Sequence, residues 1–264
     1  MKRKQIVLYL VVLLGLVSAG YAEENKKLVV TFDLTYMSKY MSKGSSPYGS
    51  HGAFFETFNI DLWGTGFGVS VGHQAAIGSG DFNGKGLADK RRLNYGVYYG
   101  TSFFKDEVYE TKFRFDWIYK DYYDRARTIG NSQELIFDFS WPNILPIKNL
   151  SPYYIAHYEC PAGSGYANKS ISGTVHRFGL AYDWALPKLP NPLRLSAETA
   201  YTDGYGGKTV DHDWSYSTFG ISTKFNLTDN LSLVPGLYQQ ITMDNSVNSK
   251  DSITYCKISM KYKF

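Results

Sequence analysis

The sequence predicts an all-β fold, an antiparallel up-and-down transmembrane β-barrel of about twelve strands. Three observations support this prediction. Stretches of alternating apolar and polar residues recur about every twenty residues, short and long connections join them in turn, and the chain ends on an amphipathic strand with an aromatic last residue. Aromatic residues make up 17% of the chain, as is typical of barrels that carry aromatic girdles at both membrane interfaces.

The clearest alternation lies in residues 109–119, YETKFRFDWIY. Aromatic residues and Thr111 occupy one face, while the other face carries Glu110, Lys112, Arg114 and Asp116. A helix of this sequence would have no apolar stripe, whereas a strand is strongly amphipathic because successive side chains point to opposite faces.

The same alternation defines the other strands in chain order. We expect strands at residues 28–36, 57–62, 67–76, 93–103, 109–119, 134–141, 152–160, 177–184, 193–201, 213–225, 230–241 and 252–264. The connections at 64–66, 105–108, 142–151, 187–192 and 228–230 are short or contain Pro, and those at 38–52, 77–90, 120–131, 161–172, 202–212 and 242–250 are longer and polar. Short turns at one end and long loops at the other are typical of outer-membrane barrels, and an even number of strands places both termini in the periplasm.

A secreted β-sandwich is the alternative fold, because it too alternates apolar and polar residues along its strands. Two features favour the barrel. The polar face carries many Gly, Ser and Ala residues, as a crowded lumen requires, and the hairpins follow one another without a long crossover. Closure of a barrel also removes the sheet edges, which lipid does not tolerate.

The N-terminal segment has the pattern of a secretory signal peptide. Lys2, Arg3 and Lys4 precede an apolar run at residues 6–16, and Gly20-Tyr21-Ala22 ends on the small residues that a signal peptidase requires. We therefore predict a signal peptide at residues 1–22 and one barrel domain at residues 23–264. Three of the 28 basic residues lie in this leader, which leaves 25 against 24 acidic ones and gives no indication of nucleic-acid binding.

The end of the chain and its beginning both resemble known outer-membrane proteins. Phe264 lies on the apolar parity of the last strand, and such a terminal aromatic resembles the signal that the barrel-assembly machinery binds in bacterial outer-membrane proteins. The stretch LTYMSKYMSKGSSPYGS (Leu34–Ser50) resembles the opening of the TorF-like putative porins, with Ser38, Lys39, Tyr40 and Gly44 in a Ser-Lys/Arg-Tyr-x-x-x-Gly element, and FNIDLWGTGFGVSVG is similar to the second hairpin of that family. The resemblance covers about the first fifty residues after the leader and implies an outer-membrane location.

Charged residues gather on the face that the strand pattern turns toward the lumen. They are Asp33, Asp61, Glu110, Lys112, Arg114, Asp116, Glu134, Asp138, Arg177, Asp183, Arg194, Glu198, Lys224, Lys257, Lys261 and Lys263. Charged lumens set ion selectivity, so we expect a porin-like channel for ions or small polar solutes. Twelve strands lie between filled barrels and open sixteen-stranded porins, so the pore is expected to be narrow.

Cross-strand ion pairs could instead plug the lumen, which would leave a structural or adhesive barrel.

The channel prediction makes one specific statement about side-chain contacts, for the strand at 109–119. We expect Lys112 and Arg114 to meet Glu134 and Asp138 of the following strand, leaving open space toward the small, uncharged residues of the preceding strand.

A third, lesser alternative is an outer-membrane lipid hydrolase, which would need Ser and His together on the lipid face. His176, Ser215 and Ser217 have that parity, but an intervening strand separates the His from both Ser residues, so we expect no enzyme activity. No cofactor or metal motif is present in the sequence. The cluster Lys90, Arg91 and Arg92 lies where a long loop returns to the barrel. It is a candidate contact for lipopolysaccharide phosphates, and a solvated rim without such a contact is the equal alternative.

Overall fold

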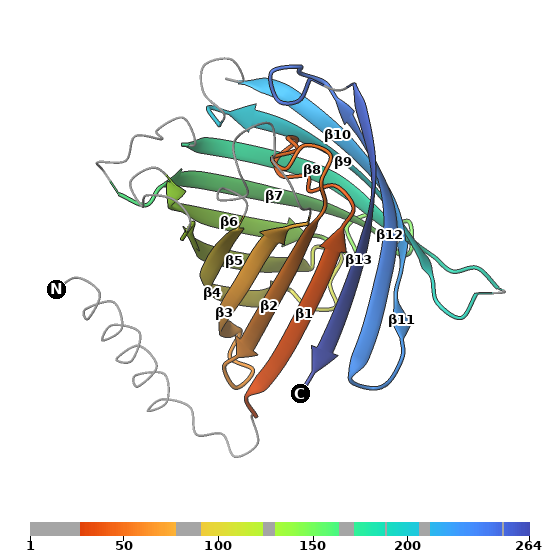
Figure 1. Cartoon of the computed structure of the whole chain (residues 1–264). Helices are drawn as coiled ribbons and strands as arrows, with labels where there is room; N and C mark the ends of the chain where they lie inside the picture. The colour runs from red at the N-terminus through yellow and green to blue at the C-terminus, as the bar shows by residue number, and fades with distance from the viewer. Residues whose placement is uncertain are drawn as a thin grey trace.

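The computed structural model describes residues 27–77, 91–123, 130–163, 172–187, 189–205, 212–249 and 251–264. The predicted signal peptide at residues 1–22 lies outside the described residues. Thirteen strands form one antiparallel sheet (Figure 1): β1 Val29–Met37, β2 Ala53–Asp61, β3 Phe67–Ala76, β4 Arg91–Phe103, β5 Thr111–Asp121, β6 Ser132–Ser140, β7 Leu150–Pro161, β8 Gly173–Trp184, β9 Leu193–Asp203, β10 Asp213–Thr223, β11 Phe225–Asn226, β12 Leu231–Thr242 and β13 Ser252–Lys263.

The sheet closes into a barrel of twelve crossing strands, as the sequence predicts. Each strand pairs with its neighbours in the chain, and β1 pairs with β13 to close the ring. The two-residue strand β11 continues β10, since both pair with β12 in one register. Their pairing is interrupted opposite Pro235, which has no N–H to donate.

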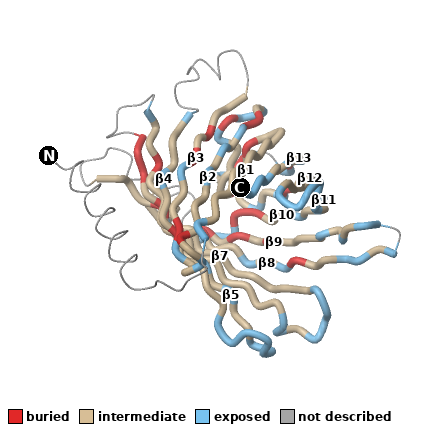
Figure 2. The backbone as a smooth tube through the Cα atoms, turned by 90° about the horizontal axis from the view of Figure 1, so that it is seen from below, coloured by how far each residue is buried: buried red, intermediate tan, exposed pale blue. Residues whose placement is uncertain are grey.

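The distribution of burial is the reverse of that in a soluble protein. Large apolar side chains such as Phe58, Val71, Phe219 and Leu237 are between 48% and 53% exposed on the outer wall. The buried polar side chains include Gln74, Lys120, Glu134, Glu159, Glu198 and Gln240. Only short stretches of the wall are buried (red in Figure 2). An apolar outside around a polar inside fits a barrel in lipid and excludes the β-sandwich.

Connection lengths separate by end, as predicted. The segments 62–66, 104–110, 141–149, 185–192 and 224–230 have five to nine residues and lie at one end, and the connections at the other end have nine to fifteen. The C-terminus and the start of β1 lie at the short-turn end (Figure 1). No helix in the described ranges is long and apolar enough to cross a membrane.

Three tyrosines on the lumen wall each lie against a glycine directly across the neighbouring strand. Tyr98 faces Gly68, Tyr153 faces Gly179 and Tyr238 faces Gly220. A Cβ added at any of these glycines would lie between 2.0 and 2.6 Å from the ring opposite. The glycines therefore let the rings lie flat on the wall, where they take little space from the lumen.

Candidate functional site

The interior of the barrel contains a large cavity at the short-turn end, which we call the basal cavity. Its volume is about 920 Å³, and it reaches the turn between β6 and β7 at residues 142–149. Its charged lining consists of Lys112, Asp138, Lys148, Arg177, Asp183, Arg194 and Glu198. Six of these seven residues, all except Lys148, were predicted to face the lumen.

The long β1–β2 connection, residues 38–52, folds back into the other end of the barrel. Within it, Tyr40 and Tyr48 are buried and pack together with ring centroids 4.8 Å apart. Gln74 of β3 donates to the Tyr48 hydroxyl at 2.6 Å, and Gln240 of β12 donates to the Gly44 carbonyl at 2.7 Å. We call residues 38–52 the mouth loop, because these contacts hold it across the opening.

Gly44 is required at the tip of the mouth loop. Its φ is +84°, a left-handed conformation that favours glycine. A Cβ here would lie 2.4 Å from the ring of Tyr216 in β10. The tip therefore packs directly against the far wall of the lumen.

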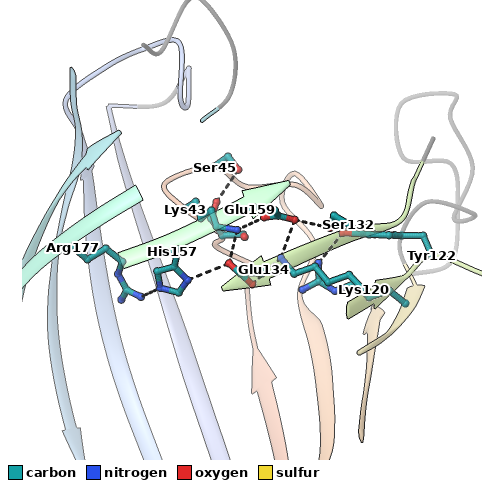
Figure 3. Close-up of polar contacts among 11 residues, drawn as sticks. Lys43, Ser45, Lys120, Tyr122, Ser132, Glu134, His157, Glu159 and Arg177 are labelled. Carbon is teal, nitrogen blue, oxygen red and sulfur yellow. Dashed lines mark hydrogen bonds and ion pairs between the residues drawn. The ribbon is translucent and has the colours of Figure 1, made fainter. Parts of the chain in front are cut away.

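Lys43, beside that glycine, completes a buried group of four charges (Figure 3). Its Nζ lies 2.7 Å from Glu134 Oε1 and also pairs with Glu159. Lys120 Nζ lies 2.8 Å from Glu134 and 3.0 Å from Glu159. All four side chains are only 5–8% exposed, so two cations and two anions neutralise each other out of water. We call these residues the charge quartet.

The pKa of Lys43 follows from this arrangement. Burial alone would lower the pKa of Lys43, but the carboxylates of Glu134 and Glu159 raise it well above its ordinary value. Lys43 is therefore positively charged at every physiological pH, and the mouth loop stays paired with the opposite wall.

A chain of polar contacts continues from the quartet along the wall (Figure 3). Arg177 Nη1 lies 3.2 Å from His157 Nε2, and His157 Nδ1 lies 3.1 Å from Glu134. A guanidinium can only donate, so Nε2 accepts and the neutral imidazole donates from Nδ1 to Glu134. Arg177 also forms a bidentate pair with Glu198 at 2.8 and 2.6 Å.

A second cavity of about 330 Å³ lies beneath the mouth loop, and we call it the inner cavity. It shares Tyr153, Arg177, Ser196 and Glu198 with the basal cavity, so the two spaces meet at these residues. The remaining lining comes from the mouth loop and the strands β1, β10, β12 and β13: Met37, Met41, Lys43, Gly44, Tyr216, Thr218, Tyr238, Gln240, Tyr255 and Lys257.

The predicted pairing of Lys112 and Arg114 with β6 is wrong. Arg114 donates to Asp116 on its own strand at 2.8 and 2.7 Å, and its guanidinium lies 4.2 Å from the centre of the Tyr98 ring. Asp138 is the direct cross-strand partner of Arg114 but makes no ion pair with it. The Tyr98 ring, flat over Gly68, offers the guanidinium a face toward β4, the side expected to be open.

Two other predicted lumen residues lie near the short-turn end. Glu110 precedes β5, because the 104–110 turn, with Phe104 and Asp106 at positive φ, extends further than expected. Its carboxylate accepts a hydrogen bond from Asn143. Lys224 is exposed at the break between β10 and β11, so neither residue is part of a lumen strand.

Most of the remaining predicted charges on the lumen face form local contacts, whereas Lys257 forms no ion pair with a described residue. Asp33 accepts from Asn59 at 2.8 Å and lies 3.9 Å from Lys261, Arg194 pairs with Asp183 at 3.2 Å, and Asp61 accepts from the Gly64 N–H. Lys263 is the exposed last residue of β13, and Phe264 follows the strand with its N–H bonded to the Val30 carbonyl.

Sequence reasoning missed most of the buried polar network. Lys120 lies on the same alternating face of β5 as the predicted lumen residues, and His157 and Glu159 lie together on one face of β7. Following the alternation to the ends of these strands would therefore have found all three residues. Lys43 lies in a loop, and no sequence signal indicates that it faces the lumen.

The residues considered for a lipid hydrolase do not meet. His176 contacts the Tyr154 hydroxyl at 2.7 Å, and Ser217 donates to Thr199. A register shift between Trp214 and Tyr216 buries Ser215 against the Ala200 carbonyl, so its predicted lipid-facing position is wrong. No metal-binding group of His, Cys, Asp and Glu occurs within the described ranges.

The basic cluster at the start of β4 is divided between the two faces. Lys90 lies outside the described residues, Arg91 is exposed, and Arg92 donates to the Tyr122 hydroxyl at 2.7 Å. Arg91 and Arg92 therefore do not form one continuous basic patch toward lipid.

The closed antiparallel barrel of twelve strands, apolar outside and charged inside, is the fold of bacterial outer-membrane β-barrels. Among solved structures, this chain is similar to the NanC porin, with a TM-score of 0.51, 12% identity, and coverage of 88% of this chain and 100% of that one. It is also similar to the KdgM porin (TM-score 0.49, 10% identity, 89% and 99% covered) and to the outer membrane phospholipase of Salmonella typhi (0.45, 13%, 88% and 90%). At these identities the likeness concerns the fold alone.

No protein-family model matches the sequence, and no curated protein matches it. The resemblance to the TorF-like putative porins therefore stays a prediction.

Proposed function

We propose that this protein is a narrow porin-like channel of the outer membrane of a Gram-negative bacterium, which passes ions or small polar solutes by diffusion. The observation that carries the proposal is the pair of cavities, of about 920 and 330 Å³, that meet at Tyr153, Arg177, Ser196 and Glu198. Together they follow the lumen from the short-turn end to the underside of the mouth loop.

The charge distribution supports a channel that is narrow and weakly selective. Most charges on the lumen wall are neutralised by a neighbour, as in the pairs Arg114–Asp116, Arg177–Glu198 and Arg194–Asp183. Paired charges leave a weak net field, so selectivity depends on the few charges without a partner.

A plugged structural barrel is the second candidate, and the mouth loop favours it. Lys43 ties this loop to the opposite wall through two buried carboxylates, and a loop held in this way restricts passage. We infer a restricted channel rather than a plugged barrel, because the basal and inner cavities lie in the lumen between this loop and the short-turn end.

We propose no enzymatic activity, since His176 has Tyr154 rather than a serine as its partner. The proposed partners are the outer-membrane lipid, lipopolysaccharide at the loop end, and the barrel-assembly machinery, which would bind β13 and Phe264. Both termini would then lie in the periplasm, on the short-turn side.

Conductance of the refolded protein in planar lipid bilayers tests the proposal. We expect discrete single-channel steps in potassium chloride that are smaller than those of sixteen-stranded porins under the same conditions. A heat-modifiable, folded barrel that inserts into bilayers and yet conducts nothing would establish the plugged structural barrel in its place.

A further inference from the structure

The inner cavity contains one cation that no carboxylate neutralises. Its charged lining consists of Lys43, Arg177, Glu198 and Lys257. Lys43 pairs with Glu134 and Glu159, and Arg177 is held bidentately by Glu198. Lys257, half-buried in β13, forms no ion pair with any residue in the described ranges. An unpaired ammonium in a partly dry space is costly, and an anion entering the cavity would offset that cost.

The wall around Lys257 is unusually flat and aromatic. Tyr238 and Tyr255 stack with their ring centroids 5.3 Å apart and their planes 15° apart. The ring of Tyr238 lies against Gly220 and Gly236, where an added Cβ would come within 2.6 and 2.8 Å of it. Two tyrosines fixed in this way give the cavity a broad apolar surface with polar edges.

The rest of the lining supplies hydrogen-bonding groups next to this surface. The hydroxyls of Ser196 and Thr218 line the cavity beside the stacked tyrosines. A volume of about 330 Å³ lies within the range of small-molecule sites, which combine apolar walls with a few converging polar groups.

We propose that the inner cavity binds a small hydroxylated carboxylate, with the carboxylate at Lys257, the carbon chain against Tyr238 and Tyr255, and hydroxyl groups at Ser196 and Thr218. An inorganic anion would use the cation but not the aromatic wall. A neutral polyol would use the wall and leave Lys257 unpaired. The inference rests on the proposed function only for access, because solute would reach this site from the basal cavity.

Equilibrium binding to the folded barrel in a non-ionic detergent tests the site, with sodium gluconate as the probe and isothermal titration calorimetry as the readout. Glucose is the matched neutral probe and sodium chloride the matched small anion. We expect gluconate to bind at least about tenfold more tightly than glucose, since a hydrogen bond to a charged group is worth more than a neutral one. Equal affinities for gluconate and glucose, or no binding of gluconate, would overturn the proposal.

Two variants connect the binding to the named residue. Lys257→Gln should weaken gluconate binding at least about tenfold and leave glucose unchanged, whereas Lys224→Gln, an exposed lysine outside the cavity, should change neither. Unaltered gluconate affinity in a folded Lys257→Gln barrel would also overturn it. If this variant does not fold, the comparison of gluconate with glucose on the wild-type protein still decides.

Because binding is measured without current, it separates the site from the channel. A barrel that binds gluconate through Lys257 but never conducts would contradict the proposed channel and support the proposed binding site. A barrel that conducts potassium chloride and does not distinguish gluconate from glucose would support the proposed channel and contradict the proposed binding site.

Discussion

Tyr153 lies flat against Gly179, its direct partner across β7 and β8, and its hydroxyl donates to Glu198 at 3.0 Å. The ring lines both the basal and the inner cavity, at the point where they meet. A Cβ on Gly179 would lie 2.1 Å from the ring, so no larger residue fits while the tyrosine stays flat. The glycine thus determines how far the tyrosine extends into the lumen.

Gly179→Ala should therefore narrow the channel at this junction. The methyl group would push the Tyr153 ring toward the lumen and lengthen its hydrogen bond to Glu198, with an overpacking cost of about 1–3 kcal/mol. We expect lower single-channel conductance and a lower free energy of unfolding in urea. Gly100→Ala is the control, because a Cβ there has no atom closer than 3.9 Å; a similar fall in both variants would contradict this account.

Lys43→Ala should release the mouth loop from the opposite wall. The change leaves Lys120 as the one charged partner of both Glu134 and Glu159, a loss of about 3–5 kcal/mol for a broken buried pair. We expect larger conductance steps and faster proteolysis within residues 38–52. Lys39→Ala in the same loop is the matched control, and an unchanged current in the Lys43 variant would show that the loop does not limit passage.

The pH dependence of the mouth loop follows from the raised pKa of Lys43. A lysine whose pKa is raised on folding stabilises the folded state fully below its ordinary pKa, about 10.4, and loses this contribution only as the pH rises through the higher folded value. Conductance and protease resistance should therefore not change between pH 7 and pH 9. Opening of the loop within that range would mean that Lys43 is not held as the structure indicates.

Ion preference should depend on the unpaired charges of the basal cavity. Lys112 lines this cavity and forms no ion pair with a described residue, so Lys112→Ala removes a positive charge and should shift the reversal potential toward cation preference. Arg114→Ala should act in the same direction, because it leaves Asp116 unpaired. Lys105→Ala, in an exposed turn, is the control. Equal shifts of the reversal potential in all three variants would mean that ion selectivity does not arise in the lumen.

Phe115→Lys should impair folding into bilayers. Phe115 packs on Phe137 with ring centroids 5.2 Å apart on the outer face, and a lysine at the middle of the lipid face costs about 2–4 kcal/mol. We expect a lower folded fraction in bilayers by the gel shift of heat-modifiable barrels. Lys112→Ala on the opposite face should fold normally, and equally mild effects would contradict the assignment of the faces.

Deletion of Phe264 should lower the amount of protein in the outer membrane without reducing export. The centroid of the terminal ring lies 4.9 Å from that of the Tyr262 ring, and Phe264 is 67% exposed, so it is accessible to the assembly machinery and contributes little to packing. Membrane fractionation checks this, and normal insertion of the truncated chain would leave the terminal signal without support.

The twelve strands and the face of nearly every charge could be predicted from the sequence, because strand side chains alternate with a period of two. Lys112, Asp138, Arg177, Asp183, Arg194 and Glu198 line the basal cavity as that period requires. The same period fails where it is interrupted: Glu110 lies in a turn, Lys224 at the break opposite Pro235, and Ser215 in a register shift.

What the sequence by itself determined was therefore the wall, namely the order of its strands and which side chains face lipid or lumen. Only the tertiary structure decided what lies within the wall. Arg114 pairs with Asp116 instead of its cross-strand neighbour, and Lys43 crosses the opening to reach Glu134 and Glu159. Faces follow from local geometry, whereas contacts across a lumen depend on how closure of the barrel brings together residues about a hundred positions apart in the chain.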